Sequence, residues 1–412
     1  MPTGVSDAGT VVLTVDDVAI SVWKGYEFSC NFLSPTDDWW FTLGDDLVGP
    51  DLIRRLVPGS AVKLSIDGND QAAGYIRKRS IRTGRAGGTE ILITGSDAMW
   101  PVTESTVMPG QTFPETETLG SMIERLLRPF GFIIFAVDNA DNRNRITGAV
   151  THAKHKDAAN LRTVRLNAQK PKDHETIFSY LSRVAQREGM WIWPSADGLG
   201  VIVSKPNYDQ APRYTLRHRV SGAGNNILAG EVFWDASDQP SYLMTSATIP
   251  AGDREERVVT AYTASPFESR TLVATGPTGT TTTLGAIALI ADKHMVEVPS
   301  STINLARQNA FASKVSRPRY LRDQSSQTVA QLEAFTRREM SLLQRRAFGA
   351  RYTISGHKLD GQVVGVDTVI DVDDDRSDLH APMWVAGRTL RRDRNGGTTT
   401  ELDLLPLGAL AF

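Results

Sequence analysis

Five aspartates lie within the ten residues VIDVDDDRSD, residues 369–378. Carboxylates at this density could bind a divalent cation or serve as general acids and bases. Asp371, Asp373 and Asp375 occupy the first, third and fifth positions of an EF-hand calcium loop. The first hypothesis for this segment is therefore a cation site.

The match to a calcium loop is incomplete. The sixth position needs glycine for a sharp turn and holds Arg376, and the twelfth needs a bidentate glutamate and holds Pro382. Three readings of Asp371–Asp375 stay open on these residues alone: a cation site, a catalytic carboxylate cluster, and the exposed tip of a β-hairpin.

Histidines are the next candidates for chemistry. His152 and His155 have H-x-x-H spacing, but no strongly periodic helix or nearby carboxylate accompanies them, which favours a surface loop over a zinc site. His357, at the start of a predicted strand in SGHKLDG, has no partner base or nucleophile motif, which favours a structural role over a general base. G-x-S-x-G, H-E-x-x-H, P-loop and dinucleotide motifs are all absent from the sequence. We therefore predict no catalytic, cofactor-binding or metal-binding residue.

Basic and aromatic side chains could instead serve binding. Trp191 and Trp193 alternate on one strand face, which favours a core or interface role over a sugar platform. The basic residues of one segment favour a solvated face or a subunit contact; the alternative is a lumen through which DNA or an acidic protein passes. These residues are Lys314, Arg317, Arg319, Arg322, Arg337, Arg338, Arg345, Arg346 and Arg351.

The composition is that of a globular protein. The chain has 412 residues, 41% of them hydrophobic, which is enough for two to four domains with cores of their own. Its 45 basic and 47 acidic residues nearly balance, which argues against tight binding of nucleic acid. Cys30 is the only cysteine, so an internal disulfide is excluded. The start of the sequence does not resemble a signal peptide, and we predict no membrane insertion.

Strand signals dominate residues 10–98. Short β-branched runs end at Asp-Asp and Lys-Gly turns, and Val62, Leu64 and Ile66 alternate before an Asp67-Gly68 turn. Gly87-Gly88 marks a second hairpin tip. This part of the chain is predicted to be all-β.

Residues 99–206 change character and indicate an α+β arrangement. TLGSMIERLLRPFG has apolar residues at helical spacing, with Thr118 as the N-cap and Gly131 as the stop. DHETIFSYLSRVAQREG predicts a second helix capped by Asp173. MWIWPSADGLGVIV predicts a hairpin that turns at Asp197-Gly198.

The remaining sequence is harder to interpret. Strand-like runs continue to about residue 249, and ATGPTGTTTTLG has the composition of a loop. SSQTVAQLEAFTRREMSLLQRRAFG predicts a helix with Val329, Leu332, Met340 and Leu343 on one side. Residues 350–412 return to strands.

Two segments of the sequence share a pattern. Residues 62–95 and 368–406 each contain a strand, an acidic turn, a second strand, a basic stretch, a Gly-Gly pair and a third strand. The stretch SIRTGRAGG in the first segment corresponds to TLRRDRNGG in the second. The shared order of several signals indicates two copies of one β-domain. The aspartate cluster then corresponds to an ordinary turn in the first copy, which favours the hairpin-tip hypothesis.

The order of these segments resembles the baseplate hub proteins of contractile-tailed phages, in particular the Mu-type tail hub, and the hub part of type VI secretion spike proteins. The resemblance covers residues 10–412. Its most specific parts are REGMWIWPSADGLGVIV and FGARYTISGHKLDGQVVGVDTVIDV. Residues 245–325 depart most from it.

The resemblance implies a β-rich α+β fold with two tube-like β-barrels around an α+β domain, assembled as a ring-shaped homotrimer of pseudo-sixfold symmetry. Such a ring connects the tail tube or a tube-initiator protein to a central membrane-piercing spike, beside baseplate wedge proteins. Passage of DNA through the lumen is compatible with it. It also implies a virion structural protein of the tail baseplate, assembled in the host bacterial cytoplasm. The predicted domains are 1–98, 99–206, 207–245 with 346–412, and an insertion at 246–345.

Two other functions remain as alternatives. The first is a tail-associated cell-wall hydrolase, because carboxylates are plentiful and a catalytic pair is not recognisable from spacing. The second is a carbohydrate-binding protein, because the chain has eight tryptophans.

Overall fold

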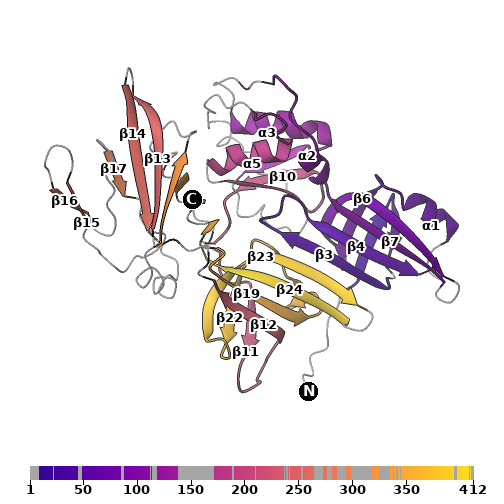
Figure 1. The fold of residues 1–412 in the computed structure, drawn as a ribbon. Helices are drawn as coiled ribbons and strands as arrows, with labels where there is room; N and C mark the ends of the chain where they lie inside the picture. The colour runs from indigo at the N-terminus through magenta and orange to yellow at the C-terminus, as the bar shows by residue number, and fades with distance from the viewer. Residues whose placement is uncertain are drawn as a thin grey trace. The chain divides into compact units, whose positions relative to one another are not determined.

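The structure is a computed structural model (Figure 1). The chain forms two compact units, a larger one of residues 1–185, 190–231 and 351–404 and a smaller one of residues 186–189, 232–350 and 405–412. No helix within the described residues is long and apolar enough to span a bilayer. The structure describes residues 9–409 except for 22, 45–48, 85–87, 112, 114–117, 138–170, 188–189, 209, 236, 238–239, 241, 252–253, 264–271, 276–280, 285–293, 298–316, 324–331, 333–334, 337, 340–341, 344, 394–396 and 408.

The N-terminal part of the larger unit consists of strands, as predicted, with one short helix. That helix, α1, was not predicted, because six residues are too few to show a helical period. Its elements are β1 (Val11–Val15), β2 (Val18–Ile20), β3 (Gly25–Asn31), β4 (Asp38–Gly44), α1 (Pro50–Arg55), β5 (Ala61–Ile66), β6 (Asn69–Gly84) and β7 (Gly88–Asp97).

The turn between β5 and β6 forms where the sequence places it. Asp67 and Gly68 have φ of 49° and 79°, and Ile66 pairs with Asn69 across them. Two successive residues with positive φ make a type I′ turn, whose twist matches that of the flanking strands.

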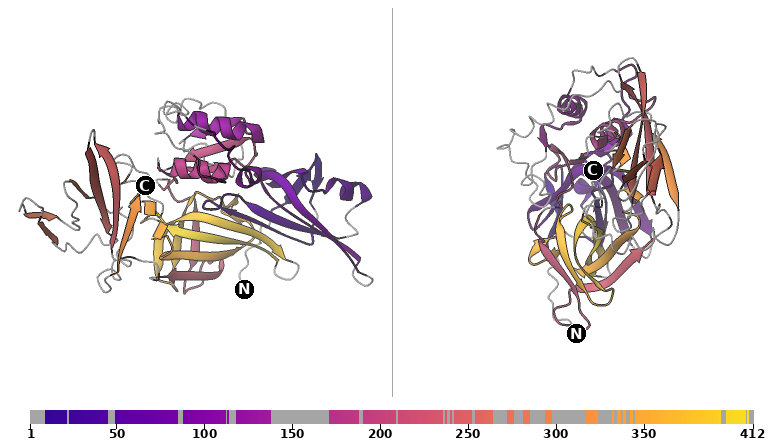
Figure 2. Two further views of the ribbon diagram at one scale, coloured as in Figure 1. Left: turned by 45° about the horizontal axis from the view of Figure 1, so that its top comes forward. Right: turned by 90° about the vertical axis from the view of Figure 1, so that its left-hand side faces the viewer.

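The α+β part follows, and its helices pack on a three-stranded sheet through a common core (Figure 2). Thr118 caps α3 as predicted. Its hydroxyl oxygen accepts a hydrogen bond from the Ser121 N–H, and the Ser121 hydroxyl oxygen accepts one from the Thr118 N–H. The prediction that Asp173 caps the second helix, α5, is wrong. Thr176 is the residue directly before the helix, and its hydroxyl oxygen accepts from the Ser179 N–H at 3.2 Å, so Thr176 is the N-cap. The elements are α2 (Trp100–Glu104), α3 (Leu119–Leu127), η2 (Arg128–Phe130), β8 (Ile134–Val137), α5 (Ile177–Arg187), β9 (Trp191–Pro194) and β10 (Gly200–Ser204).

The C-terminal strands belong to the same large sheet as the N-terminal ones. Its order is β12-β19-β24-β23-β3-β4-β7-β6-β5-β1-β2, and β22 pairs with both β23 and β11. The C-terminal strands of this sheet are β11 (Tyr214–His218), β12 (Ile227–Trp234), β19 (Phe348–Ser355), β22 (Val369–Asp374), β23 (Leu379–Asp393) and β24 (Gly397–Pro406). β20 (Lys358–Leu359) and β21 (Gln362–Val363) pair with each other in a separate two-stranded sheet.

The two segments with a shared sequence pattern have the same strand plan. β5, β6 and β7 contain six, 16 and ten residues, and β22, β23 and β24 contain six, 15 and ten. We call β5–β7 the first meander and β22–β24 the second. Arg79 of the first meander donates to the Ile53 carbonyl, and Arg388 of the second donates to the Val364 carbonyl. Each acceptor lies shortly before its meander, so the correspondence extends to side chains.

The strand β23 joins the two halves of the large sheet: the N-terminal half, formed by β1–β7, and the C-terminal half, formed by β11, β12, β19 and β22–β24. Its residues 379–384 pair with β22, and its residues 387–392 pair antiparallel with β3 (Figure 1). One long strand therefore has two neighbours in succession along the same edge.

The smaller unit contains a four-stranded sheet of order β17-β14-β13-β18. The loop predicted for ATGPTGTTTTLG is wrong in part, because β15 and β16 pair at its two ends. The described positions from Leu332 to Leu343 are helical, as predicted, and both leucines are buried. The predicted C-terminal end is wrong, because residues 345–347 form a turn and β19 begins at Phe348. Val329 and Met340 lie outside the described residues. The strands are β13 (Tyr242–Ala251), β14 (Arg254–Thr263), β15 (Leu272–Thr275), β16 (Thr281–Leu284), β17 (His294–Glu297) and β18 (Pro318–Asp323).

We expect Gly95→Ala to lower the free energy of unfolding by at least about 2 kcal/mol, because the new methyl group overpacks the sheet. A Cβ at Gly95 would lie 2.0 Å from Cζ2 of Trp39 and 2.3 Å from the Tyr75 carbonyl oxygen. Urea denaturation measures the change. Gly49→Ala is the matched control, since nothing lies within 4 Å of its Cβ position. Equal midpoints for the two variants would contradict the prediction.

Candidate functional site

The aspartate cluster forms one arm and the tip of a β-hairpin, as the sequence comparison favoured. Asp371 and Asp373 belong to β22, where they pair with Pro382 and His380. The tip spans residues 375–378, and Asp378 ends it with φ of 51°. An EF-hand loop would need these positions to wrap around one point, and an extended strand does not do so.

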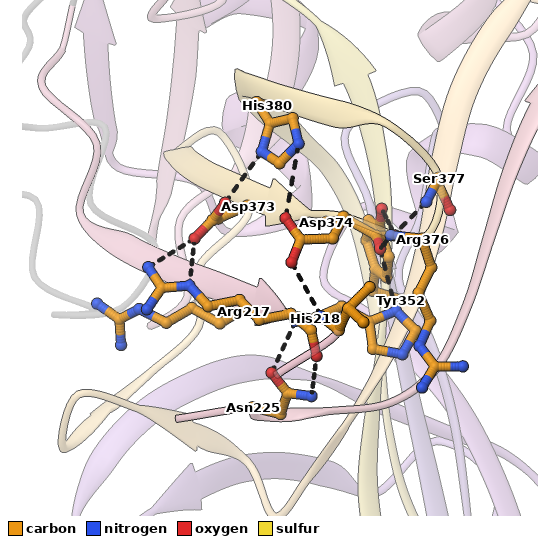
Figure 3. A network of polar contacts seen from close by, with 12 residues as sticks. Arg217, His218, Asn225, Tyr352, Asp373, Asp374, Arg376, Ser377 and His380 are labelled. Carbon is orange, nitrogen blue, oxygen red and sulfur yellow. Dashed lines mark hydrogen bonds and ion pairs between the residues drawn. The ribbon is translucent and has the colours of Figure 1, made fainter. Parts of the chain in front are cut away.

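Asp374 is the buried member of the cluster and the centre of a polar network (Figure 3). Its carboxylate accepts from the Tyr352 hydroxyl at 2.8 Å and from the backbone N–H of Arg376 at 3.0 Å and of Ser377 at 3.3 Å. Nδ1 of His218 lies 3.1 Å from the same carboxylate. The carboxylate thus holds three separate segments together: the hairpin tip, β11 and β19.

The network shifts the pKa values of Asp374 and Tyr352. Burial by itself raises the pKa of Asp374, but the hydrogen bonds from Tyr352, Ser377 and Arg376 and the charge of His218 outweigh it and hold the pKa below its ordinary value. Burial, with the neighbouring carboxylate, raises the pKa of the Tyr352 hydroxyl. Asp374 is therefore a charged structural acceptor and a poor general acid.

Two further aspartates of the cluster, the half-buried Asp373 and the exposed Asp375, hold the segment that follows β11. Asp373 accepts from Nε of Arg219 at 2.7 Å, and Nδ1 of His380 lies 2.9 Å from it. These two contacts hold the pKa of Asp373 below its ordinary value. Asp375 accepts from the Val220 N–H at 2.9 Å.

Among the described residues, ligand atoms of Asp373, Asp375 and His380 lie within 4.8 Å of one another, close enough to surround a cation. Asp371, the first position of the calcium-loop pattern, is not part of this group. Asp373 and Asp375 already accept hydrogen bonds from Arg219 and Val220, which follow β11. These contacts attach the hairpin tip to the neighbouring loop.

His357 lies at the junction of the two halves. It is fully buried, and its Nε2 lies 2.7 Å from the Tyr26 hydroxyl of β3 while its Nδ1 lies 2.9 Å from Oγ1 of Thr400 of β24. Burial, and then the positive charge of Arg388, lowers the pKa of His357 to about 4. The imidazole is thus neutral at pH 7 and bridges two hydroxyl groups, which agrees with the structural role predicted for it.

Arg388 is a second buried polar residue of this junction. The residue is 2% exposed, and its guanidinium donates to Oε1 of Gln71 at 2.7 Å and lies 5.7 Å from the centre of the Phe28 ring. Gln71 and Phe28 come from the N-terminal half, so the side chain links the two halves as the strand pairing of β3 and β23 does.

The remaining predicted residues fall in different places. Trp193 is buried and Trp191 half-buried, and both rings contact Phe32, so they belong to the packing between β9 and the N-terminal strands. His152 and His155 lie outside the described residues, as do Lys314 and Arg337. The other basic residues are exposed at Arg317, Arg319, Arg322, Arg346 and Arg351 and half-buried at Arg338 and Arg345.

Comparison with known proteins gives a fold and no sequence family. No protein-family model matches the sequence, and no curated protein matches it. The tail protein of Neisseria meningitidis MC58 superposes with a TM-score of 0.71 at 19% identity over 97% of each chain. The 43 kDa tail protein of prophage MuSo2 from Shewanella oneidensis gives 0.65 at 14% identity over 97% of this chain and 99% of that one. The chain has the fold of phage tail proteins.

A third structure of this fold comes from the Francisella PdpA–VgrG complex in its half-lidded form. A chain of that complex gives a TM-score of 0.51 at 9% identity, over 98% of this chain and 59% of that one. The resemblance predicted from the order of segments is therefore confirmed at the level of fold, because the match spans nearly the whole chain.

Sequence reasoning missed the residues that connect distant segments. Tyr352 gave no motif, and the pairing of Tyr26 with His357 spans 331 positions. One feature of the sequence could have indicated these residues: a polar residue at a position where the alternation of a strand predicts a buried side chain. Asp374 and Arg388 both occupy such positions, and both are buried.

Proposed function

We propose that the chain is the structural hub of a contractile-tail baseplate. Three copies form a ring, and each contributes two similar tube-like β-barrels, so the ring presents six related faces about a threefold axis. One side of the ring meets the sixfold tail tube or its initiator, and the other holds a central spike.

The observation that carries this proposal is the repeated meander. Strands of six, 16 and ten residues recur as six, 15 and ten, and both sets lie in one sheet. A protein that joins a threefold object to a sixfold one gains two comparable binding faces per subunit from such a duplication. The likeness in fold to tail proteins supports the same function.

The proposal also assigns the domains, the mode of action and the partners. Residues 1–98 form one barrel and 207–245 with 346–412 the other; 99–206 is the domain between them, and 246–345 is an insertion. The hub acts by binding and carries out no catalysis. Its partners are the spike, the tube or tube initiator and the wedge proteins, in a particle assembled in the bacterial cytoplasm.

Light scattering coupled to gel filtration tests the proposal. We expect a mass three times that of one chain, and electron micrographs of the same fractions are expected to show rings with six similar lobes. A monomer at every concentration, both alone and mixed with the spike protein, would contradict the hub function. We also expect incubation with purified peptidoglycan to release no soluble sugar; release would favour the hydrolase instead.

A further inference from the structure

The repeat specifies a second strand pairing that one chain cannot make with itself. Inside the chain, β23 of the second meander pairs with β3 along residues 387–392. In that pairing Leu390 lies opposite Phe28, and Arg391 lies opposite Glu27 with 3.4 Å between Nε and Oε2. The corresponding edge of the first meander is the second part of β6.

Sequence and strand lengths fix the correspondence between the meanders. Because SIRTGRAGG matches TLRRDRNGG, Ser80 corresponds to Thr389, Ile81 to Leu390 and Arg82 to Arg391. The two hairpins that open the meanders give the same alignment, since Tyr75 pairs with Ala61 where Trp384 pairs with Val369.

The first meander leaves this edge open. β5 pairs with β6 only as far as Tyr75, and no described strand pairs with residues 77–84 on that side. Ile81 is 43% exposed there, whereas its counterpart Leu390 is 1% exposed under β3. An open edge with an exposed isoleucine is a template for another strand.

The counterpart of β3 in the second half is β12, which is also open. β3 neighbours β4, which pairs with β7; in the same order β12 neighbours β19, which neighbours β24. β12 is an end strand of the sheet among the described residues, its residues 228–231 are exposed, and Leu228 is 57% exposed.

The register of β12 follows from its packing on β19. The Gly356 N–H donates to the Thr398 carbonyl, which places Tyr352 opposite Leu402. Leu402 corresponds to Ile93, the partner of Phe41, so Tyr352 corresponds to Phe41.

Tyr26 pairs with Phe41 in the first half. Gly230 packs on the Tyr352 ring, because a Cβ at Gly230 would lie 2.6 Å from that ring. Gly230 thus corresponds to Tyr26, and the next residue, Glu231, corresponds to Glu27.

We propose that β12 of one copy pairs antiparallel with residues 77–84 of β6 in a second copy, in the register that places Glu231 opposite Arg82. The pairing repeats between chains the contact that β3 and β23 make within one chain, down to the Arg–Glu pair. It covers Ile81 with Val232. The contact uses two different edges, so each copy binds the next one head to tail. Three copies then close a ring; the number three rests on the proposed function.

A disulfide tests the register. Arg82→Cys combined with Glu231→Cys is expected to give covalent dimers and trimers on a non-reducing gel after mild oxidation. Two controls bracket this result. Glu27→Cys with Arg391→Cys probes the equivalent pair inside one chain and leaves the mass unchanged. Arg82→Cys with Leu228→Cys is out of register by three residues and is expected to cross-link poorly.

Charge reversal tests the same contact without a covalent bond. Arg82→Glu is expected to raise the concentration needed for half-assembly by roughly tenfold or more, and adding Glu231→Arg is expected to restore it. Trimers that resist Arg82→Glu and do not cross-link through the Arg82→Cys and Glu231→Cys pair would overturn this pairing and leave the hub function standing. A wild-type chain that never assembles would overturn both.

Discussion

Asp374→Ala is expected to lower the free energy of unfolding by about 3–5 kcal/mol, the cost typical of removing one partner from a buried charged network. The substitution leaves the buried Tyr352 hydroxyl and the Arg376 and Ser377 N–H groups without their acceptor. It also removes the carboxylate that faces His218. Urea denaturation followed by tryptophan fluorescence measures the change, because Trp384 on β23 is fully buried.

The control for this prediction lies three residues away. Asp371→Ala removes an exposed carboxylate from the same strand and is expected to change stability by less than about 0.5 kcal/mol. Asp374→Asn keeps the shape but loses the charge and is expected to fall between the two. If Asp374→Ala unfolded at the same urea concentration as Asp371→Ala, the network would not stabilise the fold as argued.

Acidification from pH 7 to pH 4 is expected to destabilise the protein through His357 by about 3 kcal/mol. The pKa of this side chain is about 4 in the folded protein and has its ordinary value of about 6.5 in the unfolded chain. Between these two values the unfolded chain binds a proton that the folded protein does not. The stabilisation is therefore complete above pH 6.5 and is lost as the pH falls towards 4.

The measurement is a series of urea denaturations at pH 7, 5.5 and 4.5. His357→Gln is expected to be less stable at pH 7, because the bridge between Tyr26 and Thr400 is altered, and to lose this part of the pH dependence. His174→Asn is the matched control: it removes an exposed histidine from a position with φ of 59°, which asparagine tolerates, and is expected to keep the wild-type slope. An unchanged slope in His357→Gln would rule out this histidine as the cause.

Much of the local structure could be predicted because its determinants lie close together in sequence. The Asp67-Gly68 turn needs only two residues with positive φ, and the cap at Thr118 needs only a hydroxyl three residues before Ser121. The hairpin at Asp371–Asp375 was favoured over a calcium loop because a second copy of the pattern has an ordinary turn at that place. Short elements escaped prediction for the opposite reason: α1 and the pair β15–β16 are too brief to show a period.

The polar centres of the fold could not be predicted, because their partners are distant in sequence. Nothing near Tyr26 indicates that its hydroxyl meets His357, and nothing near Arg388 indicates Gln71, 317 positions away. Such contacts depend on the register of β3 against β23, which only the folded sheet determines. Residue types gave candidates for chemistry, and the three-dimensional arrangement assigned them to structure.

The pairing of β3 with β23 also sets the order of events during translation. Ser29 and Thr389, which face each other across it, are 360 positions apart. At ribosomal rates of about 5–20 residues per second, β3 waits about 20–70 s for its partner strand to be synthesised. During that interval the nascent chain carries an uncovered strand, and a neighbouring ribosome on the same messenger offers competing ones. We therefore expect coexpression of a chaperone that covers exposed strands to raise the yield of folded protein, and slower translation, which lengthens the interval, to lower it.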